Sequence, residues 1–298
     1  MLTNGCWPHA THIAGIIGAA DNTGATLGML PGANIMSISA TAQNYQLVNG
    51  TWGSDFNDGV APQCAGHTFN FDTQQAQFQG LLTSAVTSAL DFVADDVLLL
   101  NKIGIINYSA NGSDTKSTGT LGMRFKTVAT PLAVMSQTLP TRIQFVYRGA
   151  LIVQSAGNAY ENAGNVYENA CNVAFDEDYE MDGIIVVGGL NQDDVPVTPA
   201  NGGFTFTVDG VPGSELGSNT GPCVNMWAPS TNIISTWKLN GTQVLSGTSM
   251  AAAFVSGFAA NLVEGMAITP YTGVSRQLER EVRQKLQDMG NGIYMPRF

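Results

Sequence analysis

The amino-acid sequence predicts an α/β fold of three layers, in which a mostly parallel central sheet is covered by helices on both faces. Along the 298 residues, short apolar runs bounded by Gly, Pro and Asn alternate with longer segments of helical period, a pattern typical of such sheets. A hydrophobic content of 44% is ample for a large core. The sequence shows neither a linker nor an internal repeat, so we expect one domain over residues 1–298.

Six apolar runs are predicted to be strands. They cover residues 34–39, 104–109, 150–154, 184–188, 224–227 and 233–237. Between the first two, apolar residues recur at helical spacing from Phe78 to Val93, which predicts an amphipathic helix. The segment from Ala251 to Val263 is apolar around most of its circumference, and we therefore expect a central, buried helix there.

A last helix is predicted to begin near Ser275 and to stop at Gly290, with Leu278, Val282 and Leu286 facing inward. Its charged residues are expected to form a solvated face. They are Arg276, Glu279, Arg280, Glu281, Arg283, Lys285 and Asp288.

Two connections, residues 44–73 and 112–142, are longer than such a fold usually needs. We interpret both as surface insertions.

The composition excludes some partners and favours one location. A net charge of -11 argues against binding to nucleic acid or an anionic membrane, because both require clustered Lys and Arg. Only 12% of residues are charged, which favours a secreted, extracellular protein. No run of about 20 apolar residues could span a membrane. The first five residues lack the basic start and apolar core of a signal peptide.

The four cysteines, Cys6, Cys64, Cys171 and Cys223, show no C-x-x-C spacing, so a zinc or redox site is not expected. They are either free thiols or two disulfides, for which three pairings exist. Cys171 and Cys223 each precede a predicted strand and could bridge neighbouring strands, which would leave Cys6 to pair with Cys64.

Three short segments carry side chains suited to nucleophilic catalysis. Ser249 begins the apolar helix after a Gly-Thr turn, where backbone N–H groups point outward. His9 opens a helical segment far upstream, and Asn158 follows a predicted strand. Each residue also has an ordinary structural role, because serine is a common helix N-cap and asparagine a common turn former.

Taken together, the three segments resemble the signature blocks of the subtilisin-like serine proteases (subtilases), which read roughly HGTHVAG, AAGN and GTSMASP. The matching stretches are residues 9–15, 155–158 and 247–253. Ala10 replaces a motif Gly and Ala253 the motif Pro. The resemblance runs from His9 to the C-terminal helix and implies a subtilisin-like version of the three-layer fold.

The resemblance also implies a serine endopeptidase that hydrolyses peptide bonds through an acyl-enzyme. Ser249 would be the nucleophile and His9 the general base, while Asn158 and the Ser249 backbone N–H would hold the oxyanion. In subtilisin itself, removing that asparagine donor costs about 2.7 to 4 kcal/mol. His12 matches the second, noncatalytic histidine of the family motif and is expected to be a satisfied core residue.

The family's substrate groove would lie between two segments of this chain. One edge would be Ser109, Ala110, Asn111 and Gly112, and the other Ser155, Ala156 and Gly157. A polypeptide substrate would add to the first edge as an extra strand, held by main-chain hydrogen bonds. We expect the protein to act on such substrates as a monomer.

One member of the family's triad is not expected in this chain. Subtilases place an Asp on a first strand about 30 residues before the His, but only eight residues precede His9. At about 1.5 Å per helical residue, Asp21 would lie roughly 16 to 18 Å from His9. Asp55, Asp58 and Asp72 fall in the first insertion and match no motif.

Two explanations for the missing carboxylate stay open. The chain is either an N-terminally incomplete subtilase or a catalytically silent relative that binds partners or acts as a scaffold. Losing the triad Asp lowers kcat about 3 x 10^4-fold in subtilisin. The chain as given is therefore expected to be a very poor catalyst.

Residues 20–28 resemble a calcium loop of the family, with Asn22 at a ligand position. Oxygen ligands suit this ion, but the family draws further ligands from N-terminal residues that are lacking here. We therefore favour a plain Asn-Thr-Gly turn and expect no required cofactor or metal.

Overall fold

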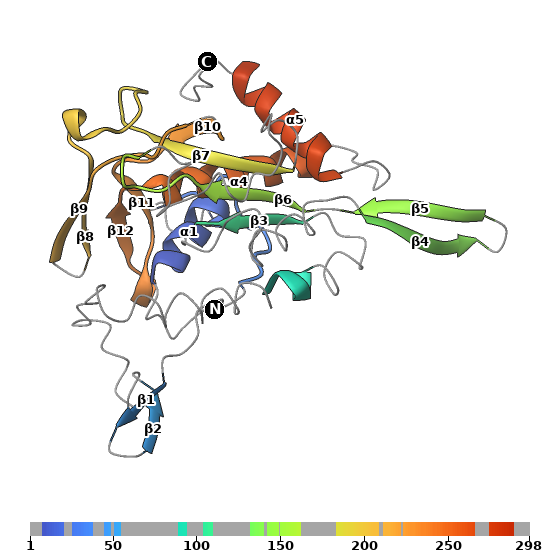
Figure 1. The fold of residues 1–298 in the computed structure, drawn as a ribbon, viewed down its shortest axis with the longest axis horizontal. Helices are drawn as coiled ribbons and strands as arrows, with labels where there is room; N and C mark the ends of the chain where they lie inside the picture. Colours follow the sequence, from blue (N-terminus) through green and yellow to red (C-terminus); the bar gives the residue numbers. More distant parts are fainter. Residues whose placement is uncertain are drawn as a thin grey trace.

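The computed structural model describes thirteen stretches of the chain (Figure 1). They are residues 8–20, 26–37, 45–48, 51–54, 89–93, 104–109, 132–139, 142–148, 150–161, 183–208, 211–221, 223–265 and 274–288. Within 45–54 and 132–148 the description concerns the backbone.

The helices are α1 (Pro8–Gly18), α4 (Thr248–Gly265) and α5 (Val274–Asp288), with the short 3-10 helices η4 (Pro199–Asn201) and η5 (Lys238–Asn240). The strands are β1 (Tyr45–Val48), β2 (Thr51–Ser54), β3 (Ile105–Tyr108), β4 (Leu132–Leu139), β5 (Arg142–Arg148), β6 (Leu151–Ser155), β7 (Ile184–Leu190), β8 (Phe204–Val208), β9 (Val211–Glu215), β10 (Val224–Pro229), β11 (Ile233–Thr236) and β12 (Thr242–Leu245).

The central sheet has the order β10-β7-β6-β3, and all of its neighbouring strands are parallel (Figure 1). Every residue of β6 and β7 is buried. Because successive side chains of a strand point to opposite faces, this burial means that both faces of the sheet are covered. The predicted α/β class with a parallel central sheet is thus confirmed.

Helix α4 crosses one face of this sheet and forms its main core, as its apolar sequence predicts (Figure 1). Its side chains share a buried cluster with alternate residues of β6, β7 and β10 and with two inward residues of α5. The α4 members are Ala251, Ala252, Val255, Phe258 and Ala259, and those of α5 are Leu278 and Val282. Leu278 and Val282 therefore face inward as predicted.

Helix α1 packs against both α4 and the antiparallel pair β11–β12. A second buried cluster joins Ile13 and Ile16 of α1 to Leu245 of β12 and Met250 of α4. The approach of α1 to α4 is close: a Cβ added at Gly257 would lie only 2.6 Å from the Met29 Cβ and 3.2 Å from the Ile17 Cα. The segment that begins with His9 is thereby held against α4, the helix whose first turn contains Ser249.

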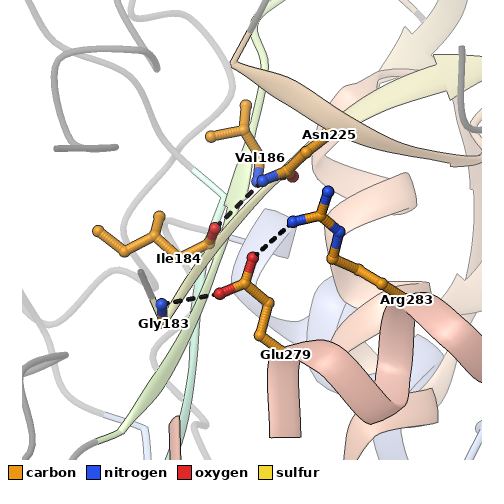
Figure 2. A network of polar contacts seen from close by, with 6 residues as sticks. All are labelled: Gly183, Ile184, Val186, Asn225, Glu279 and Arg283. Atoms are coloured by element: carbon orange, nitrogen blue, oxygen red, sulfur yellow. Dashed lines mark hydrogen bonds and ion pairs between the residues drawn. The ribbon is translucent and has the colours of Figure 1, made fainter. Parts of the chain in front are cut away.

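At a bulge in β10, a side chain makes hydrogen bonds to the backbone of the neighbouring strand β7. The pairing of β10 with β7 shifts between Val224 and Met226, which interrupts the ladder of backbone hydrogen bonds. The Asn225 side chain fills the gap, because its Oδ1 accepts from the Val186 N–H at 2.9 Å and its Nδ2 donates to the Ile184 carbonyl at 3.4 Å (Figure 2).

The expectation of a fully solvated charged face on α5 is wrong at Glu279. This carboxylate is completely buried. It accepts a hydrogen bond from the Gly183 N–H at 2.8 Å and pairs with Arg283 at 3.0 Å (Figure 2). The Gly183 N–H, just before β7, accounts for the buried acid: a buried donor needs an acceptor, and a buried charge needs both a donor and a counter-ion.

The predicted strand over residues 34–39 is not formed in its described part, residues 34–37. Ile35 and Met36 are 43% and 62% exposed. Within the described residues, β3 is the edge strand of the sheet and no strand pairs with its outer side. Two apolar residues of high strand propensity do not make a strand without a paired neighbour.

Only residues 89–93 of the helix predicted from Phe78 to Val93 are described, and they form a helical turn with Leu90 and Val93 buried. The two predicted insertions overlap antiparallel hairpins, β1–β2 in the first and β4–β5 at the end of the second. A further hairpin, β8–β9, pairs Phe204 with Glu215 and was not predicted from the sequence.

Cys223 is disulfide-bonded and fully buried. The other three cysteines lie outside the described residues, so the predicted pairing with Cys171 stays a prediction. Within the part of the chain that is described, no helix is long and apolar enough to cross a membrane.

Candidate active site

Ser249 lies in the first turn of α4, which begins at Thr248. The preceding Gly247 has φ 151°, a value in the left-handed region that favours glycine. Its N–H donates to the Ser230 carbonyl at 2.8 Å, just beyond β10. This turn therefore attaches the start of α4 to the edge of the sheet formed by the carboxyl ends of the strands.

Two hydrogen bonds join Ser249 to the end of β3. The Ser249 Oγ lies 3.4 Å from the Ser109 carbonyl, to which it donates. In the opposite direction, the Ser109 Oγ donates to the Ser249 carbonyl at 3.0 Å. The serine hydroxyl thus lies beside the segment that is predicted to form one edge of a substrate groove.

A short chain of polar side chains continues from this contact into the core. Asn107 Nδ2 donates to the Ser109 Oγ at 2.9 Å, and Asn107 Oδ1 lies 3.0 Å from the Ser256 hydroxyl of α4. The start of α4 and its third turn are consequently both tied to β3. Because α4 is otherwise packed by apolar contacts, these bonds fix its position along the sheet.

Asn158 follows β6 and contacts the residue before Ser249. Its Oδ1 accepts from the Thr248 N–H at 2.9 Å and from the Thr248 Oγ1 at 2.8 Å. The Thr248 Oγ1 also accepts from the Gly157 N–H at 3.1 Å. Thr248 is almost completely buried, so these bonds lock the asparagine amide and the start of α4 into one unit.

The nitrogen of the same amide faces an acidic residue. Asn158 Nδ2 donates to Oε2 of Glu215, at the end of β9, and this contact is exposed to solvent. The amide orientation is therefore set on both sides, with its oxygen held by Thr248 and its nitrogen by a carboxylate.

His9 lies in the first turn of α1 and is half-buried. Burial, together with a smaller effect of the neighbouring His12, lowers the pKa of His9 to about 4. The side chain is therefore neutral at pH 7. Among the described residues no hydrogen bond joins His9 to Ser249, and no carboxylate of this set raises the pKa of His9.

His12 is buried in the core, as expected, but only one of its two ring nitrogens is hydrogen-bonded in the described structure. Its Nε2 lies 3.1 Å from the Ile233 carbonyl and 3.0 Å from the Gln243 carbonyl, so it donates to strands β11 and β12. Its Nδ1 has no hydrogen-bond partner within the described structure. Burial lowers the pKa of His12, against the opposing effect of the two carbonyls.

The structure brings several of the predicted site residues to one edge of the sheet and leaves others undescribed. Ser109 follows β3, Ser155, Ala156, Gly157 and Asn158 end or follow β6, and Ser249 lies in the first turn of α4. His9 lies in the first turn of α1. The other residues considered for the site lie outside the described stretches. They are Ala110, Asn111, Gly112, Asp21, Asn22, Asp55, Asp58 and Asp72.

Four residues of this site were missed from the sequence: Asn107, Thr248, Ser256 and Glu215. Asn107 and Ser256 could have been found from the sequence, because each is a polar residue within an apolar strand or helix. Thr248 is part of the Gly-Thr-Ser motif but was given no role of its own. Glu215 carries no local signal, since its place depends on the unpredicted β8–β9 hairpin.

Comparison with known proteins assigns the family. The model of the subtilase family, Peptidase_S8, matches residues 4–288, and the chain therefore belongs to this family of serine proteases. Its fold is accordingly the subtilisin-like version of the three-layer α/β arrangement.

Individual relatives match shorter stretches. Subtilisin-like protease 1 of Trichophyton verrucosum is 35% identical over 113 residues, which are 36% of this chain and 28% of that protein. A subtilisin-like protease of Coccidioides posadasii is 40% identical over 75 residues, 25% of this chain and 18% of the relative. Among solved structures, S41 psychrophilic protease shares the fold with a TM-score of 0.52 at 17% identity, over 94% of this chain and 68% of that one.

Proposed function

We propose that this chain carries the catalytic serine, base and oxyanion donor of a secreted, monomeric serine endopeptidase that hydrolyses polypeptides and requires no cofactor. Ser249 attacks the scissile carbonyl while His9 takes up its proton; the C–N bond then breaks, and His9 gives that proton to the leaving amine. Water, whose proton His9 removes in turn, hydrolyses the acyl-enzyme and restores Ser249. Asn158 Nδ2 and the Ser249 N–H stabilise the oxyanion. The observation that supports this best is the pair of hydrogen bonds from Thr248 to Asn158 Oδ1.

Those two bonds matter because oxyanion stabilisation depends on donors that are oriented before the reaction begins. They leave the amide nitrogen of Asn158 pointing away from Thr248, and they hold it to the turn that presents Ser249. Backbone hydrogen bonds also hold this segment in place, since the Gly217 N–H donates to the Asn158 carbonyl and the Asn219 N–H to the Gly157 carbonyl. The substrate adds to the segment after β3, whose Ser109 already contacts Ser249.

His9 is a weak general base in the proposed mechanism. A base whose pKa is about 4 is available at pH 7 but has little driving force for removing a serine proton. A carboxylate bound to the imidazole would raise that pKa and fix the tautomer. We therefore expect slow chemistry from the 298-residue chain alone.

A fluorophosphonate probe tests the proposal, because it reacts only with an activated serine. The probe should label the wild-type chain, more slowly than a typical protease, and Ser249→Ala should abolish the labelling. His9→Ala should reduce it, and EDTA should leave it unchanged. The same assay is run on a chimera in which the first strand and triad Asp of a known subtilase are joined to residue 1. If neither form is labelled, the chain is instead a binding or scaffold protein with a subtilase fold.

A further inference from the structure

The contact between Glu215 and Asn158 is fixed by the backbone around it. The Gly217 N–H donates to the Asn158 carbonyl at 3.1 Å, and the Tyr160 N–H donates to the Gly217 carbonyl at 3.0 Å. Ala159 and Gly217 thereby form a parallel bridge. Glu215 stands two residues before Gly217, so this pairing places its side chain next to the Asn158 amide, where the hydrogen bond is found.

The hairpin that ends in Glu215 is supported on its other side by β12. Gln243 of β12 donates through its side chain to the Thr207 carbonyl of β8, and a Cβ at Gly203 would collide with the Glu215 carbonyl at 2.6 Å. The hairpin therefore has a defined position in the resting protein. The carboxylate itself stays exposed to solvent and can change its rotamer without moving the strands.

A carboxylate at this place opposes the chemistry proposed above. The oxyanion and the Glu215 carboxylate both accept from the same nitrogen, so they would lie within a few ångströms of each other. Like charges at that separation repel even in a watery environment. This repulsion is present even if the oxyanion and the carboxylate accept hydrogen bonds from different protons of Nδ2.

We propose that Glu215 is a positioning residue that holds the Asn158 amide in the resting protein and has to release it before the oxyanion forms. Glu215 thus slows acylation of Ser249, and it acts through Asn158. This inference rests on the proposed function, because it assigns a restraint to the same oxyanion donor.

The test compares second-order rates of fluorophosphonate labelling in four chains: wild type, Glu215→Ala, Glu215→Gln and Glu161→Ala. Glu161 offers a matched control, because it is an exposed acid three residues after Asn158 whose carboxylate makes no hydrogen bond to that amide in the described structure. We expect Glu215→Ala to label faster by on the order of threefold to tenfold, the range that corresponds to the net contribution of one ordinary hydrogen bond. Glu215→Gln should also be labelled faster than the wild type, whereas Glu161→Ala should be labelled at the wild-type rate.

A double-mutant cycle separates this role from a general effect of charge. In an Asn158→Ala background, Glu215 has lost its hydrogen-bond partner. Glu215→Ala should then increase the labelling rate by less than half of the increase that it causes in the wild-type background. An equal gain in both backgrounds, an unchanged or lower rate for Glu215→Ala, or an equal gain for Glu161→Ala overturns the inference while leaving the proposed function standing. Labelling of none of the chains overturns the nucleophile and this inference together.

Discussion

At the scale of single residues, Thr248 determines the geometry of the site. Its hydroxyl donates to Asn158 Oδ1 and accepts from the Gly157 N–H, while its own N–H also donates to Asn158. Gly157, with φ 104°, turns the chain between β6 and Asn158 in a way that a side chain would disfavour. One buried hydroxyl therefore connects, through hydrogen bonds, the two segments that carry the proposed nucleophile and oxyanion donor.

Replacing Thr248 by valine should test this role, because the two side chains have nearly the same shape. Thr248→Val removes one bond to Asn158 and leaves the buried Gly157 N–H without its acceptor, at about 1 to 3 kcal/mol of unfolding free energy. We expect fluorophosphonate labelling of Ser249 to fall about tenfold, in line with partial loss of an oriented oxyanion donor.

Thr248→Ser is the control for that substitution, since it keeps the hydroxyl and removes only a methyl group. Its labelling rate should stay within about twofold of the wild type, because no hydrogen bond is lost. Equal rates for the serine and valine variants would show that the hydroxyl does not orient Asn158.

At the scale of elements, the side chain of Glu279 connects α5 to the start of β7 (Figure 2). The helix packs on the sheet through Leu278 and Val282, and Glu279 lies between them in sequence yet is equally buried. Its bonds to the Gly183 N–H and to Arg283 compensate for removing its charge from water. Breaking such a buried pair from one side costs more than the pair contributes, because a charge is left uncompensated.

Glu279→Ala should therefore lower the unfolding free energy by about 2 to 4 kcal/mol, measured by urea denaturation. The loss has two sources: the Gly183 N–H becomes an unsatisfied buried donor, and Arg283 loses its partner. Arg280→Ala is the matched control on the same helix, because Arg280 is exposed and its loss should change stability by about 0.5 kcal/mol or less. Similar values for the two variants would contradict the structural role of Glu279.

The elements also show how far the sequence alone could lead. Long or strongly apolar segments were predicted well, since β3, β6, β7, β10, β11, α4 and α5 all occur near their expected bounds. The predicted strand over 34–39 failed in residues 34–37 because a strand depends on a paired neighbour, which local propensity does not report. The prediction that Glu279 is solvated failed for a similar reason. Helical spacing shows on which side of the helix Glu279 lies, but only the tertiary structure shows the Gly183 N–H to which it is hydrogen-bonded.

The same limit applies to the candidate site. Ser109, Ser249, Asn158 and His9 could be selected from motifs, because each motif is local in sequence. Glu215 could not, since it approaches Asn158 through the pairing of Gly217 with Ala159. The catalytic and substrate-binding roles of all these residues stay predictions.

At the scale of the whole molecule, two neutral histidines connect stability to pH. Burial lowers the pKa of both His9 and His12, to about 4 for His9, against an ordinary value near 6.5. Between these two values the unfolded chain binds more protons than the folded one, so stability falls as pH decreases through that window. Above about pH 7.5, one unit beyond the ordinary pKa, these histidines are neutral in both the folded and the unfolded state, and stability no longer depends on pH through them.

We expect the unfolding free energy to be lower at pH 5 than at pH 7.5, with His9 contributing about 1 to 2 kcal/mol of the difference. Urea denaturation at the two pH values measures it. His9→Gln should shrink the difference by that amount, because glutamine does not titrate. An undiminished difference in His9→Gln would mean that His9 titrates normally in the folded protein.

The close approach of α1 to α4 has an evolutionary consequence. Met29 and the backbone of Ile17 fill the space where a side chain at Gly257 would go, and the Ser235 and Thr236 hydroxyls, 2.3 Å from a Cβ built at Gly15, do the same on the other side of α1. Homologues that retain this helix pair should therefore show glycine in both alignment columns. Drift away from glycine at the Gly257 column would mark lineages in which α1 and α4 have separated, and drift at the Gly15 column those in which α1 has moved away from β11.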